Sequence, residues 1–376
     1  MAGAYSIPYS WIEPNVVAAL HQVEGEGTYP ESYVDNKQFD NFTVRIMLQV
    51  SAGGDDESPM LSALETNRYY RYWHGYVVLL RPLLVFLSLN RIRALFQFLL
   101  LIAITVFVAS AVAKWGRRGV APAIIVSAAY FMFGAPQAAA CLPFFPSLIV
   151  SVILSIWVMS LGKVSRLKLA YGFMLCGIAV VYLDFLDTPS VALTVPLGLL
   201  IWRLAVDGQN AAVVLTYAAA CSAAWAIGYF GMWAGKWLLS SVVLNVNVVA
   251  DAFHQASLRA GMIESESAAN ADAISAISKN MGASAGVSFL NVALAFVCAV
   301  LAFLQVLKGD RRRSGILLVF LICAALPYAW YAVLSDHSVI HWWFTYRSQL
   351  GSAAALGLAL SYYVEGYRWK AFQRNK

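Results

Sequence analysis

The segment RYWHGYVVLLRPLLVF, residues 71–86, combines cationic and aromatic side chains with an apolar run. Arg71, His74 and Arg81 lie in it among leucines and valines, and Pro82 follows Arg81. Arginine binds phosphate through paired hydrogen bonds. A charged side chain near hydrocarbon costs about 2.5 to 3.5 kcal/mol on insertion scales and needs a partner there. The segment indicates either an anionic head-group site or the ordinary aromatic and arginine-rich border of a membrane.

Three aspartates lie at the edges of apolar sequence. Asp40 precedes NFTVRIML, where it is a candidate general base for an acceptor hydroxyl or a helix cap. Asp184 and Asp187 lie three residues apart in YLDFLDTP. Such a pair is able to bind a divalent cation or to share one proton. It is equally typical of a helix end, where the helix dipole disfavours acids and calls for a cationic partner.

A last polar group lies in SDHSVIHWWFTYRSQ, residues 335–349. His337 and His341 are four residues apart, but no HExxH or similar zinc pattern accompanies them. We therefore favour an aromatic belt in which His341, Tyr346 and Arg347 contact a phosphate, and we predict no metal site. The five cysteines are scattered singly through apolar sequence, which predicts no disulfide.

The elements that must position these residues are membrane helices. The chain has 376 residues, 60% of them hydrophobic and 12% charged, and a mean hydropathy of +0.66. Soluble domains carry roughly 25% charged residues. The composition predicts an all-α polytopic membrane protein, and no nucleic-acid partner is expected. Spanning helices need about 20 apolar residues. We expect nine, at residues 94–113, 120–140, 143–161, 167–183, 190–206, 211–233, 288–307, 314–334 and 350–367.

Basic residues set the predicted orientation. The alternate loops AKWGRRG, GKVSRLK, WRLAVDGQN and LKGDRRRSG, with the C-terminal EGYRWKAFQRNK, hold 15 of the 26 lysines and arginines. We expect these loops and the C-terminus to be cytoplasmic, in a bacterial inner membrane. All five histidines then face outward: His21, His74, His254, His337 and His341.

This topology divides the chain into four parts. Residues 1–93 form an external region with amphipathic jaw helices, and residues 94–233 form membrane helices. Residues 234–287 form an external segment, a helix on the outer leaflet followed by a looser helix and loop. Residues 288–376 form further membrane helices and a cytoplasmic tail. An external N-terminus with no preceding helix favours a missing first helix over translocation by charge bias alone.

The order of these features resembles the GT-C superfamily, membrane glycosyltransferases that use polyprenyl-phosphate sugars, such as protein O-mannosyltransferases and aminoarabinose transferases. In many of these, a His-Lys/Pro-Pro-Leu segment follows the first external loop, and an NxxxxR entry into the next helix comes after it. HGYVVLLRPLL and LNRIRALFQF occupy those places here. The likeness covers about residues 30–120 and the general helix count. The sequence is also similar to bacterial multispanning proteins that carry DNFT, RYWHGY, RPLL and FTYR strings.

The resemblance implies that Asp40 is the catalytic acid of the first loop. It also implies that Arg71, His74 and Arg81 line the donor phosphate and that Arg347 contacts it from a later outer loop. The expected activity is transfer of a sugar from a polyprenyl-phosphate carrier to a cell-envelope glycan or glycolipid on the outer face. The sequence leaves two other functions open: a transporter or flippase of a lipid-linked or anionic solute, and a non-catalytic membrane subunit.

Overall fold

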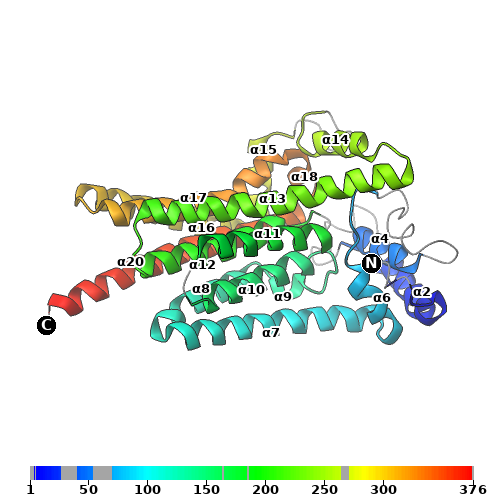
Figure 1. Ribbon diagram of the computed structural model, residues 1–376, viewed down its shortest axis with the longest axis horizontal. Coiled ribbons are helices and arrows are strands. Elements are labelled where there is room, and N and C mark those ends of the chain that lie inside the picture. The colour runs from blue at the N-terminus through cyan, green and yellow to red at the C-terminus, as the bar shows by residue number, and fades with distance from the viewer. Residues whose placement is uncertain are drawn as a thin grey trace.

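The structure is a computed structural model that describes residues 4, 6–26, 40–53, 70–162, 165–183, 186–263 and 271–374, with side chains as far as residue 365. Every regular element in these ranges is a helix (Figure 1). Asp184 lies outside the described residues. The all-helical membrane protein that the composition predicts is confirmed, because six described helices are long and apolar enough to cross a membrane.

The six are α7 (Leu89–Trp115), α11 (Arg166–Leu183), α12 (Pro189–Val206), α13 (Ala211–Leu244), α16 (Ala285–Leu307) and α17 (Arg311–Val333). Around them lie α8 (Arg117–Met132), α9 (Ala135–Ala138), α10 (Phe145–Ser160) and α20 (Leu350–Arg374). The predicted count of nine spans is therefore not confirmed. α8 and α10 have 16 residues each and are about 24 Å long, which is short of the roughly 30 Å hydrocarbon core.

α12 is the central helix of the bundle. Over an 18-residue stretch 94% of it is buried, against 28% for α7 and 17% for α16. It packs against α10, α11, α13, α17 and α20. Because its surroundings are protein on every side, the hydrophobic residues of α12 form the core, whereas those of α7 and α16 are left to face lipid.

α13 differs most from the predicted boundaries. It runs on to Leu244 instead of ending at Trp233, so its 34 residues span about 51 Å. The expected outer-leaflet helix of residues 234–287 is therefore partly the end of α13. Two short helices follow it, α14 (Val248–Arg259) and α15 (Ala273–Ala283). Both pack against α18 (Ser335–Ile340), so this region folds back onto the bundle.

The N-terminal helices α2 (Tyr9–Glu26), α4 (Asn41–Ala52) and α6 (Val77–Phe86) gather at the end of the bundle away from the C-terminus (Figure 1). They pack against one another. The link between α17 and α20 contains α18, α19 (Trp342–Thr345) and the 3-10 helix η2 (Tyr346–Gln349). We call the end that carries α2, α4 and α6 the N-terminal end of the bundle.

The basic loops meet at the other end, which we call the basic end. A cavity of about 560 Å³ there is lined by residues of three predicted cytoplasmic loops and of α20: Arg118, Asp207, Asp310, Arg312, Arg313 and Glu365. Arg118 forms an ion pair with Glu365, with a nitrogen–oxygen distance of 2.9 Å. Four of the five segments that the charge pattern groups together therefore line one cavity.

Candidate functional site at the N-terminal end of the bundle

Asp40 is buried and caps α4. Its Oδ1 accepts a hydrogen bond from the backbone N–H of Thr43 at 3.0 Å, and its Oδ2 accepts one from the Thr43 hydroxyl at 2.6 Å. Burial raises the pKa of the carboxyl above its ordinary value, although the two bonds from Thr43 oppose this. The helix-cap interpretation of Asp40 is therefore confirmed, and a hydroxyl already lies in hydrogen-bonding contact with its carboxylate.

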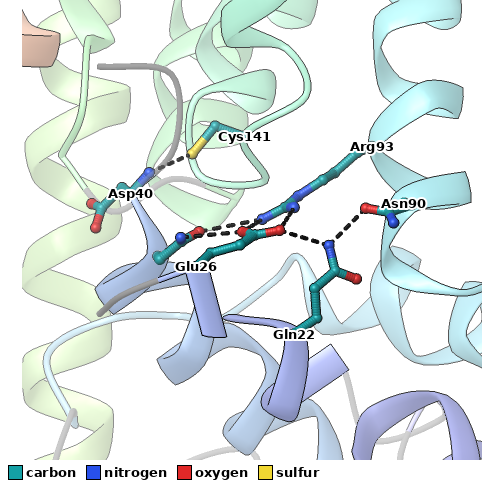
Figure 2. A network of polar contacts seen from close by, with 7 residues as sticks. Gln22, Glu26, Asp40, Asn90, Arg93 and Cys141 are labelled. Carbon is teal, nitrogen blue, oxygen red and sulfur yellow. Dashed lines mark hydrogen bonds and ion pairs between the residues drawn. The ribbon is translucent and has the colours of Figure 1, made fainter. Parts of the chain in front are cut away.

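Cys141 lies at the centre of the charged groups at this end. Its Sγ is 3.0 Å from the backbone nitrogen of Asp40 (Figure 2). Burial raises the pKa of the thiol well above its ordinary value, and the charges of Asp40 and Asp187 raise it further while Arg93 lowers it. The thiol is therefore protonated and unreactive. The charges of Asp40, Asp187 and Arg93 therefore all act on this one thiol.

Arg347 joins this group from η2. Its side chain is buried, and its guanidinium carbon lies 5.4 Å from the ring centre of Phe144 and 4.8 Å from that of Tyr346. Burial lowers the pKa of Arg347, and the neighbouring Cys141 and Tyr346 act in the opposite direction. We call Asp40, Cys141, Asp187 and Arg347 the carboxylate cluster. It contains three of the residues predicted from sequence.

A second network at this end was not predicted. Glu26 receives two hydrogen bonds from the guanidinium of Arg93, at 2.8 and 3.0 Å, and one each from the amides of Gln22 and Asn41 (Figure 2). Burial by itself would raise the pKa of Glu26, but the hydrogen bonds from Arg93, Gln22 and Asn41 and the charge of Arg93 together outweigh it, so the pKa is lowered. The pair ties α2 to α7 beside the carboxylate cluster.

Arg81 has a different surrounding from the one predicted. Its side chain is 1% exposed, and its guanidinium donates to the carbonyls of Ile7, Ser51 and Gly53, each at 2.7 Å. These contacts join α6 to the end of α4 and to the turn before α2. The geometry assigns Arg81 to holding the three N-terminal helices together, not to lining a phosphate site.

His74 is also part of the scaffold. It adopts a left-handed backbone conformation, with φ of +55°, and its Nδ1 lies 2.9 Å from the hydroxyl of Tyr76. The next residue is held as well, since Gly75 donates its N–H to the carbonyl of Tyr182 at 2.8 Å. A Cβ at Gly75 would lie 2.3 Å from that carbonyl, so the approach requires glycine. In this arrangement His74 is fixed beside Tyr76.

The apolar half of the segment 71–86 is α6, which has the predicted amphipathic character. Val78, Leu79 and Phe86 are exposed, whereas Arg81 points inward. On a membrane protein, an exposed apolar face of this kind lies against lipid. Arg81, which faces inward, donates to backbone carbonyls, whereas the resemblance implied a contact with the donor phosphate.

Arg71 lies in another cavity, which we call the tryptophan pocket. It has a volume of about 150 Å³ between α13, α14 and the end of α17. Its aromatic wall consists of Tyr72, Tyr229, Phe230, Trp233, Trp237 and Trp330. Arg71 and Arg259 also line it, and Arg71 forms an ion pair with Asp251 of α14. The pocket therefore combines a largely apolar lining with cationic groups.

The histidines connect the pocket to the carboxylate cluster. Arg259 donates to His337 Nδ1 at 3.2 Å, which leaves Nε2 to donate to the carbonyl of Leu186 at 3.2 Å. Leu186 also lines the pocket, and its neighbour Asp187 belongs to the cluster. Burial lowers the pKa of His337 well below its ordinary value and that of His341 to about 3. Both rings are therefore neutral at physiological pH.

The predicted residues thus fall into three groups. Asp40, Asp187 and Arg347 lie within electrostatic range of Cys141, and His341 lies beside His337, with ring centres 4.7 Å apart and ring planes tilted by 56°. Arg71 lies in the tryptophan pocket, whereas His74 and Arg81 support the N-terminal helices. The expectation that Arg71 and Arg347 grip one phosphate is not supported, since they contact different residues. Within the described part of the chain, no group of three or more histidines, cysteines or acids is arranged to hold a metal ion.

The sequence interpretation missed five residues of these sites: Glu26, Arg93, Asp251, Arg259 and Trp330. The sequence does contain part of the pattern that marks the tryptophan pocket. Arg259 lies at the end of an amphipathic helix, and Trp233 and Trp237, four residues apart, share a helix face. No protein-family model, curated protein or solved structure matches this chain. The function is therefore argued from the site alone.

Proposed function

We propose that the protein is a membrane glycosyltransferase of the GT-C type, with its active site at the N-terminal end of the bundle. It takes a sugar from a polyprenyl-phosphate carrier and passes it to a glycan or glycolipid acceptor of the cell envelope. The single observation that carries the proposal is the adjacency of two unlike sites. Buried carboxylates around Cys141 adjoin, through Leu186 and His337, an aromatic pocket that holds two arginines.

The carboxylate cluster has the properties of a base for a hydroxyl. A carboxyl with a raised pKa accepts a proton more readily than an ordinary aspartate does. In the transfer, an acceptor hydroxyl takes the place of the Thr43 hydroxyl on Asp40 and gives its proton to the carboxylate. Its oxygen attacks the anomeric carbon as the bond from that carbon to the phosphate oxygen breaks. The leaving polyprenyl phosphate carries the new negative charge.

The tryptophan pocket suits the other half of this reaction. A prenyl phosphate is an apolar chain that ends in an anion. The aromatic wall accommodates apolar groups, and arginine stabilises phosphate charge by hydrogen bonding. The exposed apolar face of α6 at the same end is the surface on which a lipid carrier approaches.

Asp40→Asn tests the catalytic part of this proposal. Asparagine caps a helix about as well as aspartate, so the variant keeps α4 while losing the base. We expect protein of normal yield and thermal stability that transfers less than about 1% of the labelled sugar from a radiolabelled polyprenyl-phosphate donor in detergent. Thr43→Val, which removes the hydroxyl but not the carboxylate, is the matched control and retains measurable transfer.

Full activity of Asp40→Asn would remove Asp40 as the base and leave Asp187, tested by Asp187→Asn, as the remaining carboxylate of the cluster. Donor binding without turnover by the wild type would support the transporter instead. The distribution of charge argues against that alternative. The central helix α12 carries Arg203 near its end, bonded to the carbonyls of Val158 and Leu161, and transporters place such groups at mid-membrane.

A further inference from the structure

α14 is a lightly attached wall of the tryptophan pocket. It buries only Val248 and Ala252, whereas α13 and α17, which form the opposite walls, bury residues along their whole lengths. The chain turns sharply at both of its ends, where Asn245 and Gly261 have φ of +52° and +67°. Elements with few buried apolar contacts open locally at low free-energy cost.

Among the described residues, two contacts of charged side chains hold α14 against the pocket. One is the ion pair between Asp251 and Arg71, whose side chains are 44% and 16% exposed. The other is the bond between Arg259 and His337. In the first contact, the carboxylate of Asp251 on α14 pairs with the guanidinium of Arg71 at the pocket. An anion that enters from outside must compete with that carboxylate.

The small volume of the pocket also indicates that a ligand must displace part of its wall. A cavity of about 150 Å³ accommodates a group the size of benzene, and ligand pockets usually measure about 300–1,000 Å³. A prenyl chain with a phosphate is larger than this volume, so the pocket encloses it only if one wall moves. Of the walls, α14 is the one with the least buried apolar surface.

We propose that α14 is a displaceable cover of the tryptophan pocket and that the Asp251 carboxylate holds the place on Arg71 that a prenyl phosphate takes. The ligand's phosphate replaces Asp251 on Arg71, and its chain enters against the tryptophans as α14 moves away. The cover keeps the arginine paired and the pocket small until an anionic head group arrives. The identity of the ligand rests on the proposed function, whereas the movement of α14 is tested independently of transfer.

Binding of farnesyl phosphate to the purified protein in detergent tests the competition. Asp251→Asn removes the competing charge at nearly constant size. Because a partly exposed ion pair contributes little, we expect farnesyl phosphate to bind about two- to fivefold more tightly to this variant. Farnesol, which lacks the anion, binds both proteins equally. Arg71→Gln weakens farnesyl phosphate binding about tenfold or more. Asp272→Asn is the control, because Asp272 is an exposed cap of the neighbouring α15.

Pulsed electron spin resonance tests the movement. The five native cysteines are buried, so spin labels attach selectively at His254→Cys on α14 and Leu238→Cys on α13, both exposed positions. We expect the distance between the labels to lengthen when farnesyl phosphate is added and to stay unchanged with farnesol. In the Asp251→Asn background the longer distance develops at about two- to fivefold lower concentration.

The outcomes separate the two proposals. If farnesyl phosphate binds but Asp251→Asn leaves the affinity and the label distance unchanged, α14 is not a cover and the lipid-phosphate site stands. If farnesyl phosphate binds neither the wild type nor Asp251→Asn, both the cover and the proposed donor site are wrong. Tighter binding together with a lengthened distance supports both.

Discussion

At the scale of single residues, most charged groups predicted as ligand contacts have protein partners. Arg81 donates to three carbonyls, and Asp40 accepts twice from Thr43. A buried charge needs such partners because desolvation otherwise costs several kcal/mol. The residues that keep a functional role in our proposal are those whose contacts a ligand is able to replace: Asp40 with its hydroxyl partner, and Arg71 with Asp251.

The Glu26–Arg93 pair yields a pH prediction. The pKa of Glu26 is lowered in the folded protein. The ionised Glu26 carboxylate therefore contributes its full stabilisation when the pH is above the ordinary glutamate pKa of about 4.5. This stabilisation is lost as the pH falls through the lowered pKa of Glu26 in the folded protein. We expect Glu26→Gln to lose about 2 kcal/mol at pH 7, less than the roughly 3–5 kcal/mol typical of a fully buried pair because the Glu26 side chain is 27% exposed.

Thermal unfolding in detergent from pH 3 to pH 7 measures this effect. The gap between the wild type and Glu26→Gln narrows as the pH falls below about 4.5. Glu24→Gln is the matched control on the same helix, because its 3.9 Å pair with Arg45 is exposed. A gap that stays constant over this range would show that Glu26 stabilises through packing and not through its charge.

At the scale of helices, close backbone contact decides the packing of α11 on α13. A Cβ at Gly177 would lie 2.3 Å from the Trp225 carbonyl, and a Cβ at Gly228 would lie 2.2 Å from the Met174 carbonyl. Small residues allow membrane helices to approach this closely, where van der Waals contact replaces the missing hydrophobic force. Each glycine lets its helix approach the backbone of the other, and this close packing positions α13, which carries most of the aromatic wall of the tryptophan pocket.

We predict that Gly177→Ala and Gly228→Ala each lower the midpoint of thermal unfolding by several degrees, since the added methyl group forces α11 and α13 apart. Gly231→Ala is the control on the same helix, because a methyl group added there would have no neighbouring atom within 4 Å. We expect the Gly231→Ala substitution to be neutral or slightly stabilising, because alanine is about 1 kcal/mol more favourable than glycine inside a helix. Equal losses in all three variants would contradict the packing argument.

At the scale of the whole molecule, the two ends differ in chemistry. The basic end gathers arginines with acids around an open cavity, and the N-terminal end gathers buried carboxylates, histidines and tryptophans. Figure 1 shows that the C-terminus and α2 lie at opposite ends of the bundle. The positive-inside rule predicts that the basic end is cytoplasmic, and the proposed active site is then on the outer face.

Cysteine accessibility tests this orientation. His254→Cys on α14 and Gln209→Cys beside the basic cavity are both exposed, and the native cysteines are buried. We expect a membrane-impermeant maleimide to label His254→Cys in whole cells and Gln209→Cys only after the membrane is broken. The reverse pattern would invert the topology and move the proposed site to the cytoplasm.

The sequence by itself determined the features that depend on composition and local pattern. Several hydrophobic runs of about 20 residues are typical of a membrane protein, so the helical membrane class and most helix positions followed from them. The capping position of Asp40 followed from its place before NFTVRIML. The charge pattern placed four of the basic segments together, and they line one cavity in the fold, because charge bias accumulates over many residues.

Only the tertiary structure decided which polar residues share a site. Arg71 pairs with Asp251, 180 positions along the chain, and Arg93 pairs with Glu26 across 67. Helix periodicity carries no information about contacts at such separations, because they depend on how whole helices pack. The same is true of α13. Beyond Trp233 its Ser240 hydroxyl donates a hydrogen bond to the carbonyl of Tyr70, 170 positions earlier in the chain. Local hydrophobicity predicts where a helix enters lipid, and tertiary packing determines where it ends and what it meets there.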